Sequence, residues 1–316
     1  MIEKRKVIID TDCGSDDAWA IAMALNDPNY EILMLTCVSG NVRMHQAAVN
    51  CLTTLDITDS YYPPVYEGCN EPLVRDWVGA DETHGKDGLS DLGYVPIKSK
   101  ISEGNAVIKM LEALRDNPEK TIDIVALGPL TNLAVAIRLD PETFARARRV
   151  VVMGTAGLGV GNVSPVAEFN IWQDAEACKV VLNAGIEELI FVGWDACLDE
   201  AMLNEEEINK IRSASKLGEF CIESNKILMD LNVWRFGYPC LDMADPSAMA
   251  AALYPECIEK CDKYFCEVDT QNGPSYGSVL VDFYHFSGKE PNAWICSKLK
   301  VDKYKEYIFI TLKIEQ

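Results

Sequence analysis

The chain has 316 residues, of which 48% are hydrophobic, and its 29 lysines and arginines against 49 aspartates and glutamates give a net charge of −20. This hydrophobic share is sufficient for a folded core and excludes a disordered chain. The negative charge argues against binding to nucleic acid or to an anionic membrane surface. Most of the acidic side chains are expected on a solvated surface, and the alternative is that a few of them gather around a cation.

Apolar runs alternate with helical patterns along the first half of the chain. Strands are predicted at residues 7–9, 31–38, 121–126, 149–153 and 189–192, and helices at residues 18–25, 46–55, 130–139 and 175–183. This alternation predicts an α/β fold with a parallel sheet covered by helices on both faces. The second half holds predicted helices at residues 205–213, 217–231 and 245–253, and strand-like runs at residues 263–268, 293–296 and 307–314. No linker divides the chain, so a single domain over residues 1–316 is expected.

The twelve cysteines are spread along the chain without a CxxC pair, which is not typical of a disulfide framework. The N-terminal residues lead into an apolar run that is too short for a signal peptide. The longest uncharged run, residues 150–167, contains four glycines and a proline, so no membrane helix is expected there. These observations predict a reduced, cytoplasmic protein.

Four carboxylates follow the first predicted strand, in the segment Asp10-Thr11-Asp12-Cys13-Gly14-Ser15-Asp16-Asp17. Ligands of parallel sheets bind beyond the carboxyl ends of the strands, so this segment is a candidate site. Capping of the next helix would explain Asp16 and Asp17 but not Asp10 and Asp12. Without a cation the four side chains would repel one another, whereas a hard divalent cation would be bound by all their oxygens.

Two other acidic motifs fit this segment poorly. An EF-hand loop that began at Asp10 would need a glutamate at its twelfth position, where the chain has Ile21. A haloacid-dehalogenase phosphatase would need a threonine or valine two residues after Asp12, where the chain has Gly14. The segment instead resembles the signature of the nucleoside hydrolases, aspartate-x-aspartate-proline-glycine-x-aspartate-aspartate, with Cys13 in place of the proline.

The resemblance continues in order from about residue 7 to residue 255. The further segments that match are residues 38–41, 84–89, 126–132, 152–154, 162–170 and 245–246. The resemblance implies a Rossmann-like, open and mostly parallel sheet flanked by helices. It also implies a calcium-dependent hydrolase that cleaves the N-glycosidic bond of ribonucleosides to free base and ribose, and that forms a homodimer or homotetramer.

The resemblance also implies roles for particular residues. Asp12, Asp17, Asp245 and the carbonyl of Leu127 would ligate Ca²⁺, Asp12 would be the general base for the bound water, and Asp10 would support them from behind. The residues implied in ribose binding are Asp16, Asn41, Met153, Asn162, Glu168 and Asn170. For several of these positions a structural role stays open: Asp245 before Pro246 is a helix cap, Asn162 suits a turn, and Glu168 and Asn170 suit an exposed loop.

The chain departs from the family pattern on the base side. Many members have a histidine directly before the late aspartate, where this chain has Ala244, which cannot donate a proton. The candidates to protonate, stack on or attract the base are His84, Trp234, Arg235 and Tyr238. Exposure of His84 and ordinary packing of the aromatic segment are the alternatives. The spacing between Met153 and Asn162 is also one residue longer than expected.

Two alternative functions stay open at this stage. One is a hydrolase of the same fold that acts on another ribosyl compound, for which no leaving-group acid is required. The other is a catalytically weak ribosyl-binding protein, and Asp12 argues against it because binding alone needs no base that activates water.

Overall fold

The computed structural model describes residues 4–314, so both ends of the domain expected over residues 1–316 lie outside the described residues. The strands are β1 (Arg5–Thr11), β2 (Tyr30–Cys37), β3 (Val65–Glu67), β4 (Ile122–Ala126), β5 (Arg149–Met153), β6 (Leu189–Val192), β7 (Ile258–Tyr264), β8 (Cys266–Val268), β9 (Val279–Val281) and β10 (Ala293–Leu299). The α-helices are α1 (Ser15–Asn26), α2 (Met44–Thr58), α3 (Asp81–His84), α4 (Ala106–Asp116), α5 (Thr131–Leu139), α6 (Pro141–Phe144), α7 (Phe169–Gln173), α8 (Ala175–Leu182), α9 (Glu205–Ala214), α10 (Lys216–Glu223), α11 (Lys226–Phe236), α12 (Ala244–Leu253) and α13 (Val301–Thr311).

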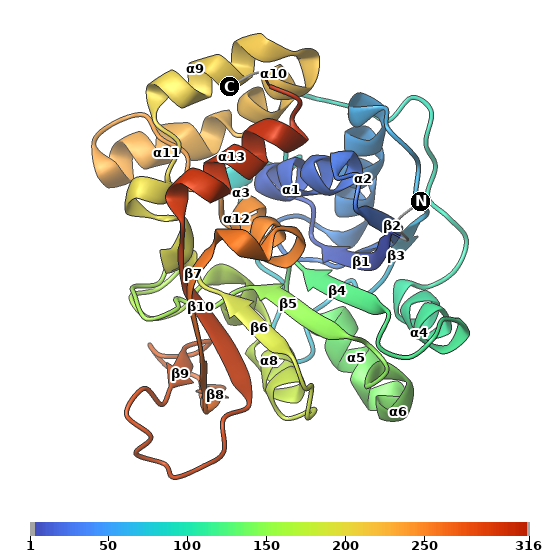
Figure 1. The fold of residues 1–316 in the computed structure, drawn as a ribbon, viewed down its shortest axis with the longest axis vertical. Helices are drawn as coiled ribbons and strands as arrows, with labels where there is room; N and C mark the ends of the chain where they lie inside the picture. The colour runs from blue at the N-terminus through green and yellow to red at the C-terminus, as the bar shows by residue number, and fades with distance from the viewer. Residues whose placement is uncertain (1–3, 315–316) are drawn as a thin grey trace.

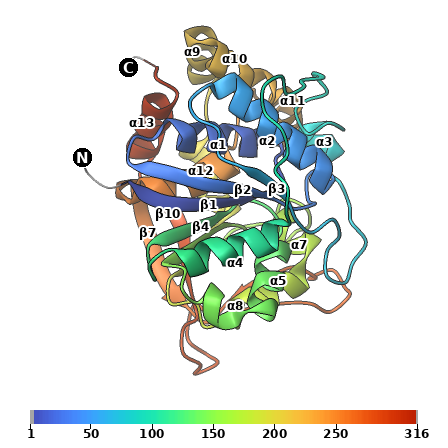
Figure 2. The same cartoon turned by 90° about the vertical axis from the view of Figure 1, so that its right-hand side faces the viewer.

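The predicted α/β architecture is confirmed. Eight strands form one sheet in the order β3-β2-β1-β4-β5-β6-β10-β7, and every neighbouring pair is parallel except β10 and β7. Helices α1, α2, α12 and α13 cover one face, and α4, α5 and α8 cover the other (Figures 1 and 2). Strands β8 and β9 form a separate antiparallel ribbon.

The direction of winding reverses between β1 and β4. The chain moves outward from β1 to β2 and β3 on one side, and from β4 to β5 and β6 on the other. In open parallel sheets the crevice at such a reversal is the usual place for a ligand. The acidic segment begins at the carboxyl end of β1, so the topology places it in this crevice.

Three predicted elements in the second half of the chain differ from the structure, one in its type of secondary structure and two in their extent. Residues 307–314, predicted as a strand, belong mainly to helix α13, in which Tyr304, Tyr307, Ile308 and Thr311 are buried at helical spacing. Packing of this stripe on α1 and α12 overrides the β-propensity of the sequence. The helix expected at residues 217–231 is broken into α10 and α11, and the strand expected at residues 263–268 is divided between β7 and β8.

The break between α10 and α11 has a local cause. Asn225, which lies between the two helices, donates from Nδ2 to the carbonyls of Ser15 (3.1 Å) and Cys221 (2.8 Å). This side chain therefore joins the end of α10 to the first turn of α1, beside the acidic segment. Over residues 4–314, no helix is long and apolar enough to cross a membrane.

Candidate active site

Asp10 joins three elements beneath the crevice. Its Oδ1 accepts hydrogen bonds from Thr36 of β2 (2.5 Å) and from Asn132 of α5 (2.8 Å). Its Oδ2 is buried without a partner among the described residues, and burial raises the pKa of this carboxyl to about 7. The supporting position implied by the sequence fits this geometry, since Asp10 anchors the strand end from which the acidic loop leaves.

Asp12 lies in a backbone cradle at the end of β1. Its Oδ2 accepts a hydrogen bond from the backbone N–H of Asn41 at 2.6 Å, and its Oδ1 is buried with no partner in the described part of the chain. A Cβ on Gly128 would lie 2.8 Å from Oδ1, and a Cβ on Gly40 would overlap Oδ2. These two glycines therefore allow the neighbouring loops to approach the carboxylate closely.

The carboxyl group of Asp17 accepts hydrogen bonds from three groups. Its Oδ1 accepts from the Thr11 hydroxyl at 2.5 Å, and its Oδ2 accepts from the Gly14 N–H (2.8 Å) and from Asn41 Nδ2 (3.2 Å). The first turn of α1 thus fixes the orientation of this carboxyl toward Asp245 on α12, which the side chain of Asp17 contacts.

The carboxyl groups of Asp16, Asp17 and Asp245 each offer an oxygen within 4.8 Å of the other two. Asp12 lies outside this triplet, but its charge acts on Asp245. The structure therefore brings Asp17 and Asp245 together as predicted, and adds Asp16, for which the sequence implied only a role in ribose binding.

Among the described residues, the four carboxyl groups of this acidic cluster have no cationic protein side chain in direct contact to balance their charge. Asp12, Asp16, Asp17 and Asp245 are all buried, and among residues 4–314 none of them forms an ion pair with a lysine or arginine. Burial and repulsion by neighbouring carboxylates raise the pKa of Asp12 and of Asp245 well above the usual range. These carboxylates are hard oxygen donors, they repel one another, and one oxygen of Asp12 has no partner in the described part of the chain. All three features are expected of residues that would bind a hard divalent cation.

The residues implied in ribose binding surround the same space. Asp16, Asn41, Met153, Asn162, Glu168 and Asn170 all line one cavity of about 750 Å³, together with Leu127, Ala244 and Asp245. Asn170 donates from Nδ2 to the Leu127 carbonyl at 2.6 Å, so it fixes the carbonyl that was predicted to ligate the metal.

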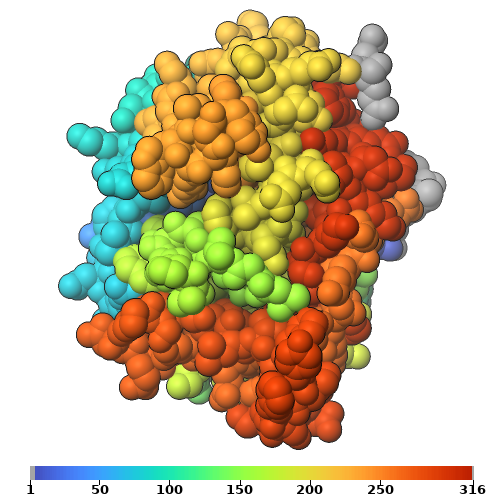
Figure 3. All heavy atoms as spheres, turned by 90° about the vertical axis from the view of Figure 1, so that its left-hand side faces the viewer, coloured from blue at the N-terminus to red at the C-terminus, as the bar shows by residue number. Residues whose placement is uncertain are grey.

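Glu168 caps helix α7 from within the cavity wall. It accepts from the N–H groups of Asn170 (2.9 Å) and Ile171 (3.3 Å), and burial raises its pKa to about 7. Asn162 Oδ1 accepts from the Phe169 N–H at 2.9 Å, which closes the loop between β5 and α7 over the cavity. In Figure 3 the N-terminal segment is visible in blue at the bottom of a hollow between this loop and the helix α11 region.

His84 is buried at the cavity wall and is not the exposed loop residue of the alternative interpretation. Its Nδ1 lies 2.8 Å from the Ser15 hydroxyl and accepts the Ser15 backbone N–H at 3.3 Å. Burial lowers the pKa of His84 to about 4, so the imidazole is neutral at pH 7. The neutral ring with an acceptor at Nδ1 carries its proton on Nε2.

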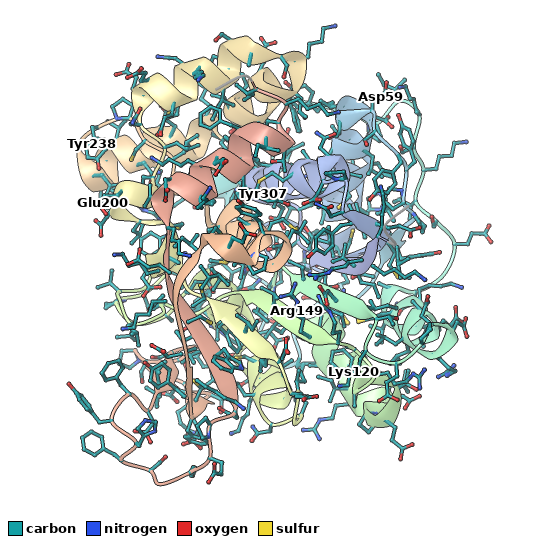
Figure 4. The ribbon with its side chains drawn as sticks, viewed as in Figure 1. Asp59, Lys120, Arg149, Glu200, Tyr238 and Tyr307 are labelled. Atoms are coloured by element: carbon teal, nitrogen blue, oxygen red, sulfur yellow. The ribbon has the colours of Figure 1, made fainter. Side chains whose placement is uncertain are left out.

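The other three residues predicted for the base side differ in where the structure places them. Trp234 and Arg235 line the cavity, whereas Tyr238 does not line it; it lies just beyond the C-terminal end of α11 and is 50% exposed (Figure 4). The other lining residues, for which no role was predicted, include Trp77, Trp172, Trp194 and Asp242. Of these, Trp194 follows the end of β6, one of the strand ends at which the ligand of a parallel sheet is expected.

Comparison with known proteins gives one family. The profile of the inosine-uridine preferring nucleoside hydrolases matches residues 7–306. The pyrimidine-specific ribonucleoside hydrolase RihB of Escherichia coli (strain SE11) is 31% identical over 301 residues, which are 95% of each chain.

Solved structures agree with this match. A plant nucleoside hydrolase superposes with a TM-score of 0.90 at 29% identity, covering 98% of this chain and 99% of the other. A purine-preferring ribonucleoside hydrolase from Gardnerella vaginalis superposes with a TM-score of 0.88 at 25% identity and the same coverage. The chain therefore belongs to the inosine-uridine preferring nucleoside hydrolase family and is a hydrolase that cleaves the N-glycosidic bond of ribonucleosides.

Proposed function

We propose that this hydrolase uses Ca²⁺ and that Asp12 is its general base. The observation that supports this most directly is the Asp12 carboxylate, whose Oδ2 is held by the Asn41 N–H while Oδ1 has no partner among the described residues. A carboxylate fixed at one oxygen and free at the other can accept a proton in a defined direction. Among residues 4–314, no contact that would stabilise the fold explains why this oxygen is buried without a partner.

The metal ligands proposed are Asp12, Asp17, Asp245 and the Leu127 carbonyl, with Asp16 close enough to contribute. All are oxygen donors, which favours calcium or magnesium over softer metals, and the larger number of donors favours calcium. The bound cation would offset the carboxylate charges and make a water molecule more acidic. Asp12 would then accept the proton of the water that attacks the ribose.

The ribose would be held by Asp16, Asn41, Asn162, Glu168 and Asn170, with the backbone at Met153. Carboxylates accept hydrogen bonds from sugar hydroxyls, and amides both donate and accept, so together they can satisfy hydroxyl groups of either polarity. Fixing the sugar in this way aligns its anomeric carbon with the water, which lowers the entropic part of the barrier.

We also propose a cellular location and an oligomeric state. All twelve cysteines are free thiols in the structure, which supports a reducing, cytoplasmic location. A homodimer or homotetramer follows only from the resemblance. Size-exclusion chromatography with light scattering would measure the oligomeric state, and a monomer at micromolar concentration would contradict this proposal.

Turnover of a nucleoside panel tests the proposed function. Ribose release is measured from inosine, adenosine, guanosine, uridine and cytidine, before and after exhaustive chelation and after return of CaCl₂, MgCl₂ or ZnCl₂. We expect turnover of at least one nucleoside, its loss on chelation, and its recovery best with calcium. Unchanged turnover in the metal-free protein would refute the proposal that the enzyme needs a metal. Recovery only with zinc would refute the proposal that the metal is calcium.

A further inference from the structure

The base end of the cavity needs a group that stabilises the departing base. When the bond between C1′ and the base nitrogen breaks, its electron pair stays on the base, so a proton or a positive charge must meet it there. Ala244, which lines the cavity next to Asp245, has no polar side chain. The other two histidines of the chain, His45 and His285, do not line the cavity.

Arg235 supplies a positive charge at this end. The residue lies in the last turn of α11, is half-buried, and lines the cavity. Its guanidinium carbon lies 5.8 Å from the centre of the Trp194 ring, within the range of a cation–π contact. Burial lowers the pKa of His84 and raises the pKa of Asp242, and the charge of Arg235 acts to lower both, so it acts on groups at two sides of the cavity wall.

Within the described residues, the protein does not use the N–H donors of the guanidinium. Over residues 4–314 the guanidinium makes no ion pair within 4.0 Å and no hydrogen bond. Every other arginine described as lying over an aromatic ring in this cavity region, Arg43 and Arg75, also donates a hydrogen bond to the protein. Arg235 therefore has its N–H donors free for a ligand.

A buried aspartate links the two elements beside this arginine. Asp242 accepts from Trp194 Nε1 at 3.0 Å and from Asn232 Nδ2 at 2.6 Å. Asn232 precedes Arg235 by three residues on α11, so the two side chains share one face of the helix. The aspartate thus fixes the indole ring and the helix that carries the guanidinium, and it holds both at the same wall.

We propose that Arg235 is a catalytic residue that stabilises the negative charge developing on the departing base, and that Asp242 is its positioning residue. This inference rests on the proposed function, because it assigns the base half of the same reaction. Water gives its hydroxyl to C1′ and its proton to Asp12, while the electron pair of the broken bond goes to the base nitrogen. The base leaves as an anion beside Arg235 and takes its proton from solvent.

An arginine acts here as a fixed charge and not as an acid. Its guanidinium keeps its proton throughout the neutral range. The rate is then expected to depend steeply on how well each base carries a negative charge. A substrate whose leaving group is already a stable anion needs little of this assistance.

The test compares two leaving groups in Arg235→Gln. The substrates are the best nucleoside of the panel and 4-nitrophenyl β-D-ribofuranoside, which has the same sugar but releases a stable phenolate. We expect kcat/KM to fall by about 10²–10³-fold for the nucleoside, as on removal of one oxyanion-stabilising donor, and much less for the nitrophenyl riboside. Lys226→Gln, an exposed cation at the other end of α11, is the matched control and should leave both rates unchanged.

Chemical rescue separates a charge effect from a folding defect. Arg235→Ala should recover nucleoside turnover when guanidinium ion is added at non-denaturing concentration, and Asp242→Asn should weaken nucleoside turnover without weakening the nitrophenyl reaction to the same degree. The ratio of wild-type to Arg235→Gln rates should stay constant between pH 6 and 9.

The possible results separate the two proposals. Equal losses on both substrates, or no loss on the nucleoside, would overturn the role of Arg235 while the proposed function stands. A rate ratio that falls with pH would assign an acid to this position instead. If the wild-type protein hydrolyses the nitrophenyl riboside but no nucleoside, the base half of the reaction is misassigned; if it hydrolyses neither, the proposed function fails and this inference fails with it.

Discussion

Removing one carboxylate from the acidic cluster should separate metal binding from folding. Asp245 is buried, contacts Asp17 and carries a pKa well above the usual range, because burial and three neighbouring aspartates oppose its charge. In Asp245→Asn the volume is conserved and one of the repelling charges is lost. We therefore expect the metal-free variant to melt at or above the temperature of the metal-free wild type, but to gain little from added Ca²⁺.

The size of the calcium effect follows from linkage. At a calcium concentration about 100 times the Kd, binding to the folded state alone stabilises it by about 2.7 kcal/mol. The entropy of unfolding is about 2.1 cal/mol/K per residue, so for 316 residues it is about 0.7 kcal/mol/K. Calcium should therefore raise the wild-type melting temperature by about 4 °C, which differential scanning fluorimetry or calorimetry measures easily.

The pH dependence of this shift has a definite sign. In the metal-free fold burial raises the pKa of Asp16 from 3.8 to about 6, and burial and neighbouring carboxylates raise those of Asp12 and Asp245 well above the usual range. Groups with raised folded-state pKa values contribute stability that is full below pH about 4 and is lost as the pH rises through the folded values. The metal-free protein should thus lose stability as the pH rises from about 4 through about 6, and the calcium shift should grow over the same interval.

Two results would refute this reasoning. One is a calcium shift in Asp245→Asn equal to that of the wild type, which would place the ion elsewhere. The other is a calcium shift in the wild type that is the same at pH 5 and at pH 8, because then protons and the cation would not compete for the same oxygens.

Three further predictions concern single side chains. Asp12→Asn should lower kcat by about 10²–10⁴-fold without lowering the melting temperature; ribose release measures the first, and full activity would remove Asp12 as the base. Glu168→Gln should raise KM by about tenfold or more, since a hydrogen bond to a charged group contributes about 1.5–3 kcal/mol; a change confined to kcat would argue against ribose binding. Tyr307→Phe removes the 2.5 Å hydrogen bond to buried Asp27 and should lower the free energy of unfolding by about 1–3 kcal/mol in urea denaturation, with kcat/KM unchanged; a loss of activity at equal stability would contradict it.

The sugar and metal half of the site could be predicted from the sequence because its residues lie at strand ends. The segment from Asp10 to Asp17 begins in the last residues of β1, and residues 126–132 begin at the last residue of β4, so the topology of a parallel sheet brings them together without further information. The sequence assigned Asp16 only to the ribose because it cannot show that the first turn of α1 directs Asp16 and Asp17 toward the same place as Asp245.

The base half could not be predicted to the same degree because long connections build it. Trp77 lies in the segment between β3 and α3, where its Nε1 donates to the Gly40 carbonyl at 2.8 Å, and no local pattern indicates that contact. Asp242 lies three residues before Asp245 and is indistinguishable in sequence from a surface aspartate. Its burial arises from partners 10 and 48 residues away.

The acidic cluster and Arg235 place charges of opposite sign in the cavity, and this arrangement matches the reaction. Cleavage of the N-glycosidic bond leaves positive charge on the ribose and negative charge on the base. Asp16, Asp245 and Glu168 line the sugar end, and Asp12 and Asp17 are buried beside them. A cation of charge +2 would offset only part of their charge, so a net negative field would still stabilise the positive sugar. Arg235 faces the other end without a protein counter-ion within 4.0 Å among the described residues. A field directed from the base toward the sugar lowers the energy of the separated charges more than that of the neutral nucleoside, which is the condition for catalysis rather than mere binding.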